Sequence, residues 1–300
     1  MRLVAQAPGK VNLCLFVGPR RSDGRHAVVT LLESVSLADE VSLTTRDGAG
    51  PDEVRCPGVE GRNIVSRALE GLRERGWTGP PVTVEIVKRV PVAAGMGGGS
   101  GDAAATLRLT QRIHALADAE LQELAAELGS DVPSQLRPGL ALGTGAGDQV
   151  DHLEILAPHA FVIVALPHEL GTAAVYAEAD RLGLARTAAE LEQKTVELVS
   201  ALSAGGQLPD ELVVNDLQAA TISLCPPVAD VIDTVRNAGA DHAMVSGSGP
   251  TVFGLFWGAD APGRSDTAAA TISERFPDAK SAVTVDADFS HPHLSAQSSH

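Results

Sequence analysis

The sequence predicts a two-domain α+β protein. Helical and strand-like patterns alternate along its 300 residues without a strict β-α-β order. The composition, 44% apolar and 20% charged, is that of a globular chain that can bury a sizeable core. A stretch rich in Gly, Ala and Thr, residues 138–147, separates two patterned halves. We therefore expect an amino-terminal domain over residues 1–150 and a carboxy-terminal domain over residues 151–300.

The amino-terminal half is predicted to start as sheet and to continue as helices. Its beginning is rich in β-branched and alternating apolar side chains, interrupted at Pro8-Gly9. A glycine-rich segment then leads into a helical run, and Asp118 and Gly129 are the expected start and stop of the next helix. In order, we expect strands over residues 4–17 (broken at Pro8-Gly9) and 28–43, a helix over 63–75, a strand over 82–87 and a helix over 102–117.

The carboxy-terminal half mixes helices and strands again. We expect a strand over residues 161–166, helices from about residue 173, over 191–202 and over 228–238, strands over 243–245 and 251–257 joined by a turn, a helix over 267–276 and an extended segment over 281–285. The last ten residues, 291–300, contain three histidines but no helical or strand period. They are predicted to fray rather than to bind a metal.

Charge and cysteine content exclude several classes of function. The formal net charge is −15, so the chain lacks the positive field that nucleic acid or an anionic membrane surface requires. No window holds the roughly eighteen apolar residues of a membrane span, and the amino terminus has no leader-like apolar stretch. Cys14, Cys56 and Cys225 lack metal or redox spacing, which indicates reduced thiols in the cytoplasm. The expected partner is a small-molecule substrate, bound by a monomer or homodimer.

The glycine-rich segment from Pro91 to Gly101 is the strongest functional signal. Glycines let backbone N–H groups approach a ligand closely, and the start of the following helix adds a partial positive charge. Together these features favour a polyphosphate, although a glycine cluster can also be a flexible turn. A Walker A loop is excluded because no lysine occurs between Gly101 and Lys194. A dinucleotide fingerprint is excluded because Ser100 stands where its third glycine is needed.

Three segments together resemble the GHMP kinase superfamily. They are Ala7-Pro8-Gly9-Lys10-Val11-Asn12-Leu13 near the amino terminus, the glycine-rich segment and its helix over Pro91–Ala105, and Val245–Gly254 near the carboxy terminus. The resemblance implies a ribosomal protein S5 domain 2-like amino-terminal domain, a ferredoxin-like carboxy-terminal domain and an active site in the cleft between them. It also implies phosphoryl transfer from ATP, with Mg²⁺ bridging and neutralising phosphate oxygens.

Within the superfamily, the sequence is similar to the diphosphocytidyl-methylerythritol kinase family. The similarity lies in Lys10-Val11-Asn12-Leu13, in Asp23-Gly24-Arg25-His26, in Leu31-Leu32-Glu33-Ser34-Val35-Ser36-Leu37 and in Leu128-Gly129-Ser130-Asp131-Val132-Pro133. Such a kinase phosphorylates the 2-hydroxyl of 4-diphosphocytidyl-2-C-methyl-D-erythritol in the non-mevalonate isoprenoid pathway. Two positions depart from the family: Arg25 replaces a tyrosine that stacks on the cytosine, and Gly101 replaces a serine or alanine.

The resemblance assigns catalysis to Lys10 and Asp131. Asp131 would accept the proton of the attacking hydroxyl. Lys10 would lie beside it, keep the carboxylate ionised and stabilise charge around the transferring phosphoryl group. The alternative is that Asp131 only caps the helix that begins at Val132-Pro133.

The resemblance also assigns the acceptor side of the site. Asn12 and His26 would face the substrate, with His26 bonded to the edge of the cytosine. Thr172 and Tyr176 would hold the other side of the base, Tyr176 by stacking. Alternatively, Tyr176 is simply an apolar residue of a helix face. Arg25 could replace the missing tyrosine, because a guanidinium plane also stacks on a base.

On the donor side, the glycine-rich loop would cradle the ATP phosphates, with the Ser100 hydroxyl on a phosphate or on Mg²⁺. Asn63 and Lys88 match positions that contact the adenosine end of ATP. The alternative for Lys88 is that it is an ordinary charged residue at the end of a strand. The residues expected to bind ATP are Asn63, Lys88, Pro91, Ala93, Ala94, Gly95, Met96, Gly97, Gly98, Gly99, Ser100 and Gly101. No protein ligand of Mg²⁺ follows from the sequence.

Two other functions stay open on the sequence. One is a GHMP kinase that acts on another small alcohol, such as a sugar or an isoprenoid precursor. The other is a non-catalytic nucleotide-binding protein with the same fold. Intact Lys10 and Asp131 argue against the second function, because a protein that only binds a nucleotide has no need for a base.

Overall fold

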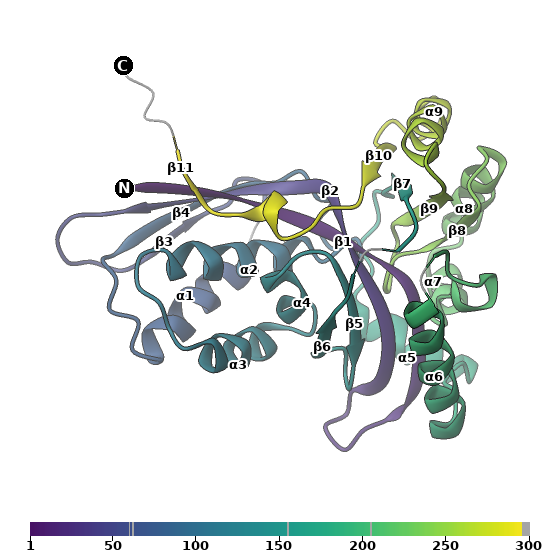
Figure 1. Cartoon of the computed structure of the whole chain (residues 1–300), viewed down its shortest axis with the longest axis horizontal. Helices are drawn as coiled ribbons and strands as arrows, with labels where there is room; N and C mark the ends of the chain where they lie inside the picture. Colours follow the sequence, from purple (N-terminus) through teal and green to yellow (C-terminus); the bar gives the residue numbers. More distant parts are fainter. Residues whose placement is uncertain (60, 62, 155, 205, 296–300) are drawn as a thin grey trace.

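A computed structural model describes residues 1–59, 61, 63–154, 156–204 and 206–295. Within these residues, two β-sheets organise the chain and helices pack on both (Figure 1). The predicted α+β fold is therefore confirmed. The first sheet has the order β11 (His293–Leu294), β1 (Arg2–Arg20), β2 (His26–Thr45), β4 (Val82–Val87) and β3 (Glu53–Arg55), with β5 (Leu140–Thr144) paired to β2 and β6 (Gln149–His152) paired to β5. The second sheet has the order β10 (Lys280–Val283), β7 (His159–Val164), β9 (Val252–Trp257) and β8 (His242–Val245).

The antiparallel hairpin of β1 and β2 runs through the middle of the first sheet. The sequence predicts two strands broken at Pro8-Gly9, but β1 is a single strand of 19 residues. Pro8 lies opposite Ala38 and Gly9 lies opposite Val35, so the two β2 residues between these partners bulge out of the ladder. The prediction of a break was wrong because this bulge absorbs the irregularity that proline causes.

Four helices cover one face of the first sheet: α1 (Ile64–Glu74), α2 (Gly98–Gln111), α3 (Asp118–Leu128) and α4 (Val132–Leu136). Helix α2 begins earlier than predicted, so that Gly98, Gly99 and Gly101 lie in its first turns. The helix lies so close to β1 that a Cβ added to Gly101 would come 2.8 Å from the Pro8 carbonyl oxygen. Glycines predicted as loop therefore serve a close helix-to-strand contact. Helix α3 ends at Gly129, as predicted.

The carboxy-terminal half packs helices against the second sheet (Figure 1). Helix α7 is absent from the sequence-based expectations because it is short and contains Thr and Ser, which are weak helix formers. No helix in the described ranges is long and apolar enough to cross a bilayer. The helices of this half are α5 (Thr172–Leu182), α6 (Ala188–Ala204), η1 (Asp210–Leu212), α7 (Gln218–Leu224), α8 (Pro227–Asn237), α9 (Ala261–Ser273) and η2 (Asp288–Ser290).

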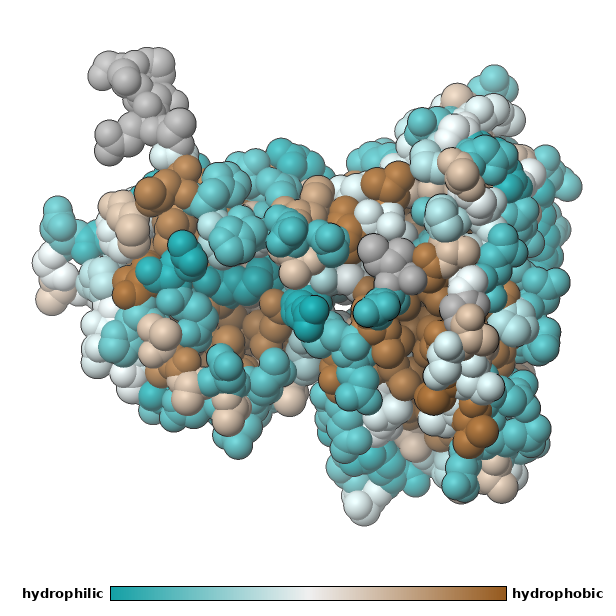
Figure 2. Space-filling model, viewed as in Figure 1, coloured by the Kyte–Doolittle hydropathy of each residue, from teal (hydrophilic) through white to brown (hydrophobic). Residues whose placement is uncertain are grey.

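The two sheets share a hydrophobic core. Val11 and Leu13 of β1 belong to the same buried cluster as Phe161 of β7 and Phe253 of β9. The two phenylalanine rings meet edge to face, with their centroids 5.8 Å apart. This core fixes the first sheet against the second. Figure 2 shows that the surface is notched between the part that carries α3 and the part that carries α5 and α6.

The chain returns to the first sheet at its carboxy-terminal end. Residues 284–289, here called the strap, follow β10 and run past β2, where the Val285 N–H donates to the Ser34 carbonyl. Beyond the strap, β11 pairs with Leu3 and Val4. The predicted fraying is wrong for this part of the tail, because the edge of β1 offers it a partner; residues 296–300 lie outside the described residues. The division at residue 150 stays a prediction.

Packing around β9 gives a testable expectation for stability. A Cβ added to Gly254 would come 2.6 Å from Val235 Cγ1 and 2.9 Å from Ala240 Cβ. We expect Gly254→Ala to lower the free energy of unfolding by about 1–3 kcal/mol through overpacking. Gly263→Ala in α9 is the control, because nothing lies within 4 Å of its added Cβ. Urea denaturation measures both, and a Gly254→Ala midpoint equal to that of the wild type would contradict the packing.

Candidate active site

A cavity of about 860 Å³ opens between the two halves of the chain. Its walls come from β1, from the glycine-rich segment, from the link between α3 and α4, from α5 and from the turn between β8 and β9. The three segments that resemble GHMP kinase motifs are therefore neighbours in space, although they are far apart in the sequence.

The Lys10 ammonium lies where these segments meet. The residue is 3% exposed, and Nζ donates to Asn12 Oδ1 at 2.8 Å and to the Gly95 carbonyl oxygen at 3.0 Å. Asp131 Oδ2 lies 3.4 Å from the same nitrogen. The Lys10 backbone N–H donates to the Met96 carbonyl, which joins β1 to the loop. Three oxygen atoms thus surround the Lys10 ammonium and offset the free-energy cost of burying its charge.

Two glycines of the loop have surroundings that a side chain would not fit. Gly95 has φ 81°, and an added Cβ would come 2.3 Å from the Ser246 carbonyl oxygen. Gly97, at the start of α2, has φ 64°, and its added Cβ would come 3.1 Å from Lys10 Cε. Positive φ angles are accessible to glycine without strain. The loop therefore needs both glycines to pack against Lys10 and the β8–β9 turn.

Asp131 occupies the position before the first residue of α4, but its side chain makes no capping hydrogen bond. The capping alternative is therefore wrong for the carboxylate. The side chain is 31% exposed and lines the cavity, with one oxygen near Lys10. Gly129 caps the end of α3 and Pro133 lies in the first turn of α4, so the short link between the helices holds Asp131 at the cavity wall. A carboxylate in this position is open to a ligand.

Asn12 holds the Lys10 side chain through a short chain of hydrogen bonds. Its Oδ1 accepts from Lys10, and its Nδ2 donates to Thr30 Oγ1 at 2.8 Å. The Thr30 hydroxyl in turn donates to the Cys14 carbonyl at 2.7 Å. This chain fixes which way the amide faces. Asn12 lines the cavity, and its contact with the acceptor stays a prediction.

His26 is held from two sides. Its Nε2 lies 2.8 Å from Asp180 Oδ1, and its ring stacks on Tyr176 with centroids 5.1 Å apart. Nε2 of a neutral ring must carry the proton there, because a carboxylate only accepts. Within the described residues Nδ1 makes no hydrogen bond to the protein, and His26 lines the cavity. Burial, and to a lesser degree the charge of Asp131, raises the pKa of Tyr176 and keeps its phenol neutral.

Thr172 and the β8–β9 turn meet at the opposite wall. The Thr172 hydroxyl lies 3.1 Å from the Ser248 hydroxyl, and both residues line the cavity. Asn215 holds this turn, because its Nδ2 donates to the Val245 and Gly247 carbonyls, each at 2.8 Å. The predicted contacts of Thr172 and Tyr176 with a base stay predictions. In the structure, Thr172 contacts the turn and Tyr176 contacts His26.

Lys88 is part of a buried charge cluster at the donor end. Its ammonium donates to Asp39 and, at 2.8 Å, to Asp102 Oδ2. Burial lowers the pKa of Lys88, but the two carboxylates outweigh burial and hold it above its ordinary value. Burial raises the pKa of Asp102 to about 7, although Lys88 opposes the shift. Lys88 lines the cavity, yet its charge is already largely neutralised.

Asn63 and Arg25 both line the cavity. The Asn63 side chain caps α1 by accepting from the Val65 N–H, so its predicted contact with ATP competes with a structural role. The Arg25 guanidinium pairs with Asp23 and with Asp148, each at 3.1 Å. In this arrangement the guanidinium is tied to two carboxylates, and its stacking on a base stays a prediction.

Most of the predicted phosphate loop reaches the cavity. Met96 and Gly101 do not: the Met96 side chain is fully buried in the core between the sheets, and Gly101 faces β1. The motif alone does not distinguish these two positions from their neighbours, because core packing turns Met96 inward and contact with β1 turns Gly101 away from the cavity. The loop residues that line the cavity are Pro91, Ala93, Ala94, Gly95, Gly97, Gly98, Gly99 and Ser100.

The residues present fit a magnesium ion that arrives with the nucleotide. No group of three or more His, Cys, Asp or Glu side chains among the described residues could hold a metal by itself. Mg²⁺ in phosphoryl-transfer sites is bound through one or two protein oxygens together with substrate phosphates and water. The Ser100 hydroxyl supplies such an oxygen at the wall of the cavity.

The sequence does not predict the residues that position the site through hydrogen bonds to its side chains and turns. Thr30, Asp180 and Asn215 are scattered polar residues without a motif, and only the fold brings them to Asn12, His26 and the β8–β9 turn. Asp102 had a signal, because it ends the glycine-rich motif directly. Its ion pair with Lys88 could have been proposed from that position.

Two family models match the chain. The model of the GHMP kinases N terminal domain matches residues 63–139, and the model of the GHMP kinases C terminal matches residues 187–280. The first range contains the glycine-rich segment and Asp131. Both halves of the chain thus carry the pattern of the GHMP kinases, the class that the fold and the lysine-centred cavity also indicate.

Individual relatives identify one family within the GHMP kinases. A curated 4-diphosphocytidyl-2-C-methyl-D-erythritol kinase from Kineococcus radiotolerans is 43% identical over 267 residues, which are 83% of this chain and 80% of the relative. A crystal structure of 4-(cytidine 5'-diphospho)-2C-methyl-D-erythritol kinase has a TM-score of 0.71 at 29% identity, covering 94% of this chain and 98% of its own. A homoserine kinase from Cytophaga hutchinsonii has a TM-score of 0.67 at 20% identity, covering 98% and 96%, and shares the fold. The chain belongs to the GHMP kinases and, among them, to the 4-diphosphocytidyl-2-C-methyl-D-erythritol kinase family.

The Asp102 carboxyl predicts a pH dependence of stability. With a pKa of about 7 in the native state and 3.8 as its ordinary value, it binds a proton in the native state where the unfolded chain has lost it. Its contribution to the free energy of unfolding therefore falls as the pH rises from about 4 to about 7. The amide of Asp102→Asn cannot titrate. The free energy of unfolding of the variant should therefore rise relative to that of the wild type as the pH rises across this range. Urea unfolding at several pH values measures the difference, and a constant difference would contradict the assignment.

Proposed function

We propose that the protein transfers the γ-phosphate of ATP to the 2-hydroxyl of 4-diphosphocytidyl-2-C-methyl-D-erythritol. The observation that carries the proposal is the position of the Lys10 ammonium, between the Asp131 carboxylate and the Gly95 carbonyl of the glycine-rich loop. Phosphoryl transfer needs a base for the attacking hydroxyl and a fixed cation beside the phosphate more than it needs covalent chemistry. The names of the curated relatives supply the acceptor.

In the proposed reaction, Asp131 accepts the proton of the acceptor hydroxyl as that oxygen attacks the γ-phosphorus. Lys10 holds the carboxylate in place and places a positive charge beside the phosphoryl oxygens. The buried hydrogen bonds of Lys10 restrict its movement, so little reorganisation accompanies the reaction. A base in this position accounts for an aspartate that does not cap its helix.

The start of α2 would receive the ATP phosphates. Glycines in the first turn expose backbone N–H groups, and the helix dipole adds a partial positive charge there. Mg²⁺ bound with ATP would neutralise phosphate oxygens, with the Ser100 hydroxyl in the first turn of α2 as a protein oxygen near them. The Lys88 cluster lies at the same end, where it would fix the helix against β2 rather than add a free cation.

The acceptor would extend from Asp131 toward His26, Tyr176 and Thr172 on the other side of the cavity. His26 presents Nδ1 as a hydrogen-bond acceptor, and the exocyclic amino group of cytosine is a donor. This complementarity supports a cytidine head group. The proposal also includes the sequence-based expectation of a cytoplasmic protein that is a monomer or a homodimer. Its three cysteines are free thiols, which supports the cytoplasmic location. Burial raises the pKa of the Cys14 thiol to about 12.

The direct test is acceptor-dependent release of ADP from Mg²⁺-ATP. Three acceptors are compared under identical conditions: 4-diphosphocytidyl-2-C-methyl-D-erythritol, homoserine and mevalonate. The proposal expects ADP release with the first alone, and a product whose phosphorus NMR spectrum shows a new phosphate ester on the 2-oxygen. Release with homoserine or mevalonate, but not with the diphosphocytidyl compound, would keep the kinase and overturn the substrate.

Removal of the base should reduce turnover with little effect on binding. We expect Asp131→Asn to lower kcat by about 10²-fold or more, by the usual size of general-base effects. Asp118→Asn, an exposed acid at the start of α3, is the matched control. Steady-state kinetics and ATP titration measure the two variants. An Asp131→Asn enzyme with wild-type kcat would remove Asp131 from the mechanism.

Asp180 should determine which pyrimidine His26 accepts. Its carboxylate fixes the ring with Nε2 protonated, so that Nδ1 accepts from the cytosine amino group but faces the carbonyl of uracil without a proton. Asp180→Asn permits the other tautomer. We expect the preference in kcat/KM for the cytidine acceptor over its uridine analogue to fall by about tenfold, the effect of one hydrogen bond.

The matched control for this experiment is Glu178→Gln on the same helix, where the carboxylate bonds to Arg181 and Ser223 and does not line the cavity. This variant should keep the preference of the wild type. An Asp180→Asn enzyme that loses activity on both acceptors equally would show that Asp180 supports the fold of the site and not its selectivity.

A further inference from the structure

A glutamate and a histidine lie against each other behind the active site, where the two sheets meet. Glu33 lies on β2 and His159 begins β7, and the two residues are 2% and 5% exposed. Glu33 Oε2 lies 3.5 Å from His159 Nε2, which is longer than a normal hydrogen bond. Within the described part of the chain, neither atom has a hydrogen-bond partner. Buried polar atoms without a partner are rare in native proteins, and here two of them are neighbours.

The pair lies within the apolar core that joins the sheets. Val11, which follows Lys10 on β1, lies opposite Glu33 in the ladder. Because successive side chains of a strand point to opposite faces, Glu33 points away from the side that carries Lys10. The His159 ring packs on Trp257 with the ring centroids 5.0 Å apart, and Val11 and Trp257 belong to the same buried cluster. The pair is therefore a polar contact between β2 and β7 in the core behind the active site.

The hydrogen bond on the other side of the imidazole determines which of its nitrogens carries a proton. His159 Nδ1 lies 2.8 Å from the Ala157 carbonyl oxygen. A carbonyl only accepts, so Nδ1 carries a proton, and in a neutral ring Nε2 is then an acceptor. A carboxylate is an acceptor too, so an ionised Glu33 beside a neutral His159 would bring two acceptors together. One proton between the two side chains removes this conflict.

The position of that proton follows from burial. A carboxylate beside an imidazolium would place two charges in the apolar core, where each loses its hydration. A protonated Glu33 that donates to a neutral imidazole places no charge there. Burial raises the pKa of Glu33, and among the described residues only His159 opposes the shift. Geometry and burial together place the proton on Glu33.

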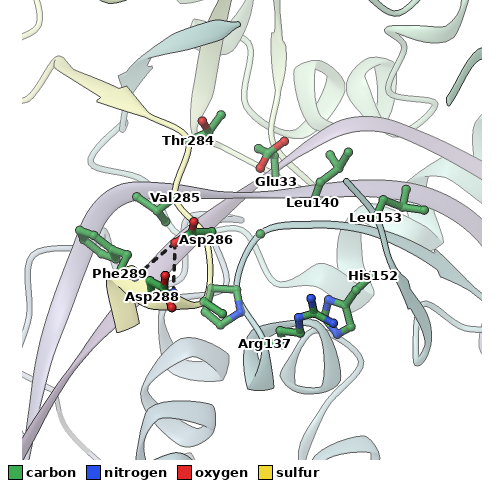
Figure 3. Close-up of a pocket in the computed structure, with 13 residues that line it drawn as sticks. Glu33, Arg137, Leu140, His152, Leu153, Thr284, Val285, Asp286, Asp288 and Phe289 are labelled. Atoms are coloured by element: carbon green, nitrogen blue, oxygen red, sulfur yellow. Dashed lines mark hydrogen bonds between the residues drawn. The ribbon is translucent and has the colours of Figure 1, made fainter. Parts of the chain in front are cut away.

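The other neighbours of the pair are apolar or lie farther away. The residues opposite Glu33 and His159 in the ladders are Val11 on β1, Leu140 on β5 and Trp257 on β9. Glu33 also borders a second cavity of about 520 Å³, between β2, β5, β6 and the strap. Figure 3 shows that the other titratable groups of this cavity lie apart from the Glu33 carboxyl group. They are Asp286 and Asp288 on the strap, and Arg137 and His152 on the other side.

We propose that Glu33 and His159 hold one proton between them, and that this proton makes the contact between the two sheets sensitive to pH. With the proton, Glu33 Oε2 donates to His159 Nε2, and β2 is joined to β7 inside the core. Without it, a buried carboxylate lies against the lone pair of a neutral imidazole, and the contact is repulsive. The larger cavity lies between the halves that this core joins, so loss of the proton loosens the support behind Lys10. This contact is independent of the proposed kinase activity.

The first experiment compares the wild type with Glu33→Gln by urea unfolding at several pH values. Glutamine does not titrate, and its amide donates to His159 Nε2 at every pH. Native Glu33 keeps a proton that the unfolded chain releases near pH 4.5, the ordinary pKa of this group, so its stabilising effect is lost as the pH rises. We expect the folding constant of the wild type to fall relative to that of the variant above pH 4.5, by up to about tenfold per pH unit. Glu123→Gln, which removes an exposed carboxylate on α3, is the matched control, and its folding constant should keep a fixed ratio to that of the wild type.

Two further measurements report on the pair itself. At neutral pH, the infrared spectrum of the wild type minus that of Glu33→Gln should contain the C=O band of a protonated carboxyl group. Hydrogen exchange measures the contact between the sheets. As the pH rises, the backbone amides of β2 and β7 should exchange faster in the wild type than in the variant at the same pH, whereas the amides of α3 should not differ.

If Glu33→Gln does not fold, nitrogen NMR of the wild type with labelled histidine decides the question. His159 should give the signals of a neutral ring, protonated at Nδ1 and accepting a hydrogen bond at Nε2. An imidazolium at neutral pH would overturn the proposal. So would a difference infrared spectrum without the carboxyl band, or a ratio of the wild-type and Glu33→Gln folding constants that does not change with pH.

Discussion

The buried ammonium of Lys10 is the constraint on which the rest of the site depends. A cation taken out of water is stable only where oxygen atoms surround it, and here Asn12, Gly95 and Asp131 supply them. These residues come from β1, the loop before α2 and the link between α3 and α4. Space is restricted as well: an added Cβ on Gly247 would come 3.2 Å from Nζ. The three segments converge because each is shaped around one charge.

The same constraint explains why β1 is a long strand next to a helix rich in small residues. Lys10 must reach the loop from a rigid support, and the ladder with β2 provides it over nearly the whole length of β1. Helix α2 must begin close to that strand, which the glycines and the buried Ala103, Ala104 and Ala105 allow. The position of the helix start, and with it the proposed phosphate site, therefore follows from small side chains facing β1.

Local patterns predicted the elements well where side chains alternate or repeat at helical spacing, as in α1, β4 and β9. Predictions from local patterns were wrong where a segment distant in the sequence determines the local structure. Pro8-Gly9 suggests a break until β2 bulges opposite it, and the last residues suggest fraying until β1 offers an edge. Motif residues that the sequence singles out, such as Lys10 and Asp131, line the cavity, whereas Thr30, Asp180 and Asn215 belong to no motif. The latter act through hydrogen bonds between segments that only the fold brings together.

The central claim is that Asp131 acts as a base in one direct transfer and does not itself receive the phosphoryl group. The stereochemical course at phosphorus tests this most directly, with ATP made chiral at the γ-position by sulfur and oxygen isotopes. A single in-line displacement inverts the configuration, which is the predicted result. Retention would require two displacements through a phosphorylated enzyme, and would contradict the role given to Asp131 and Lys10.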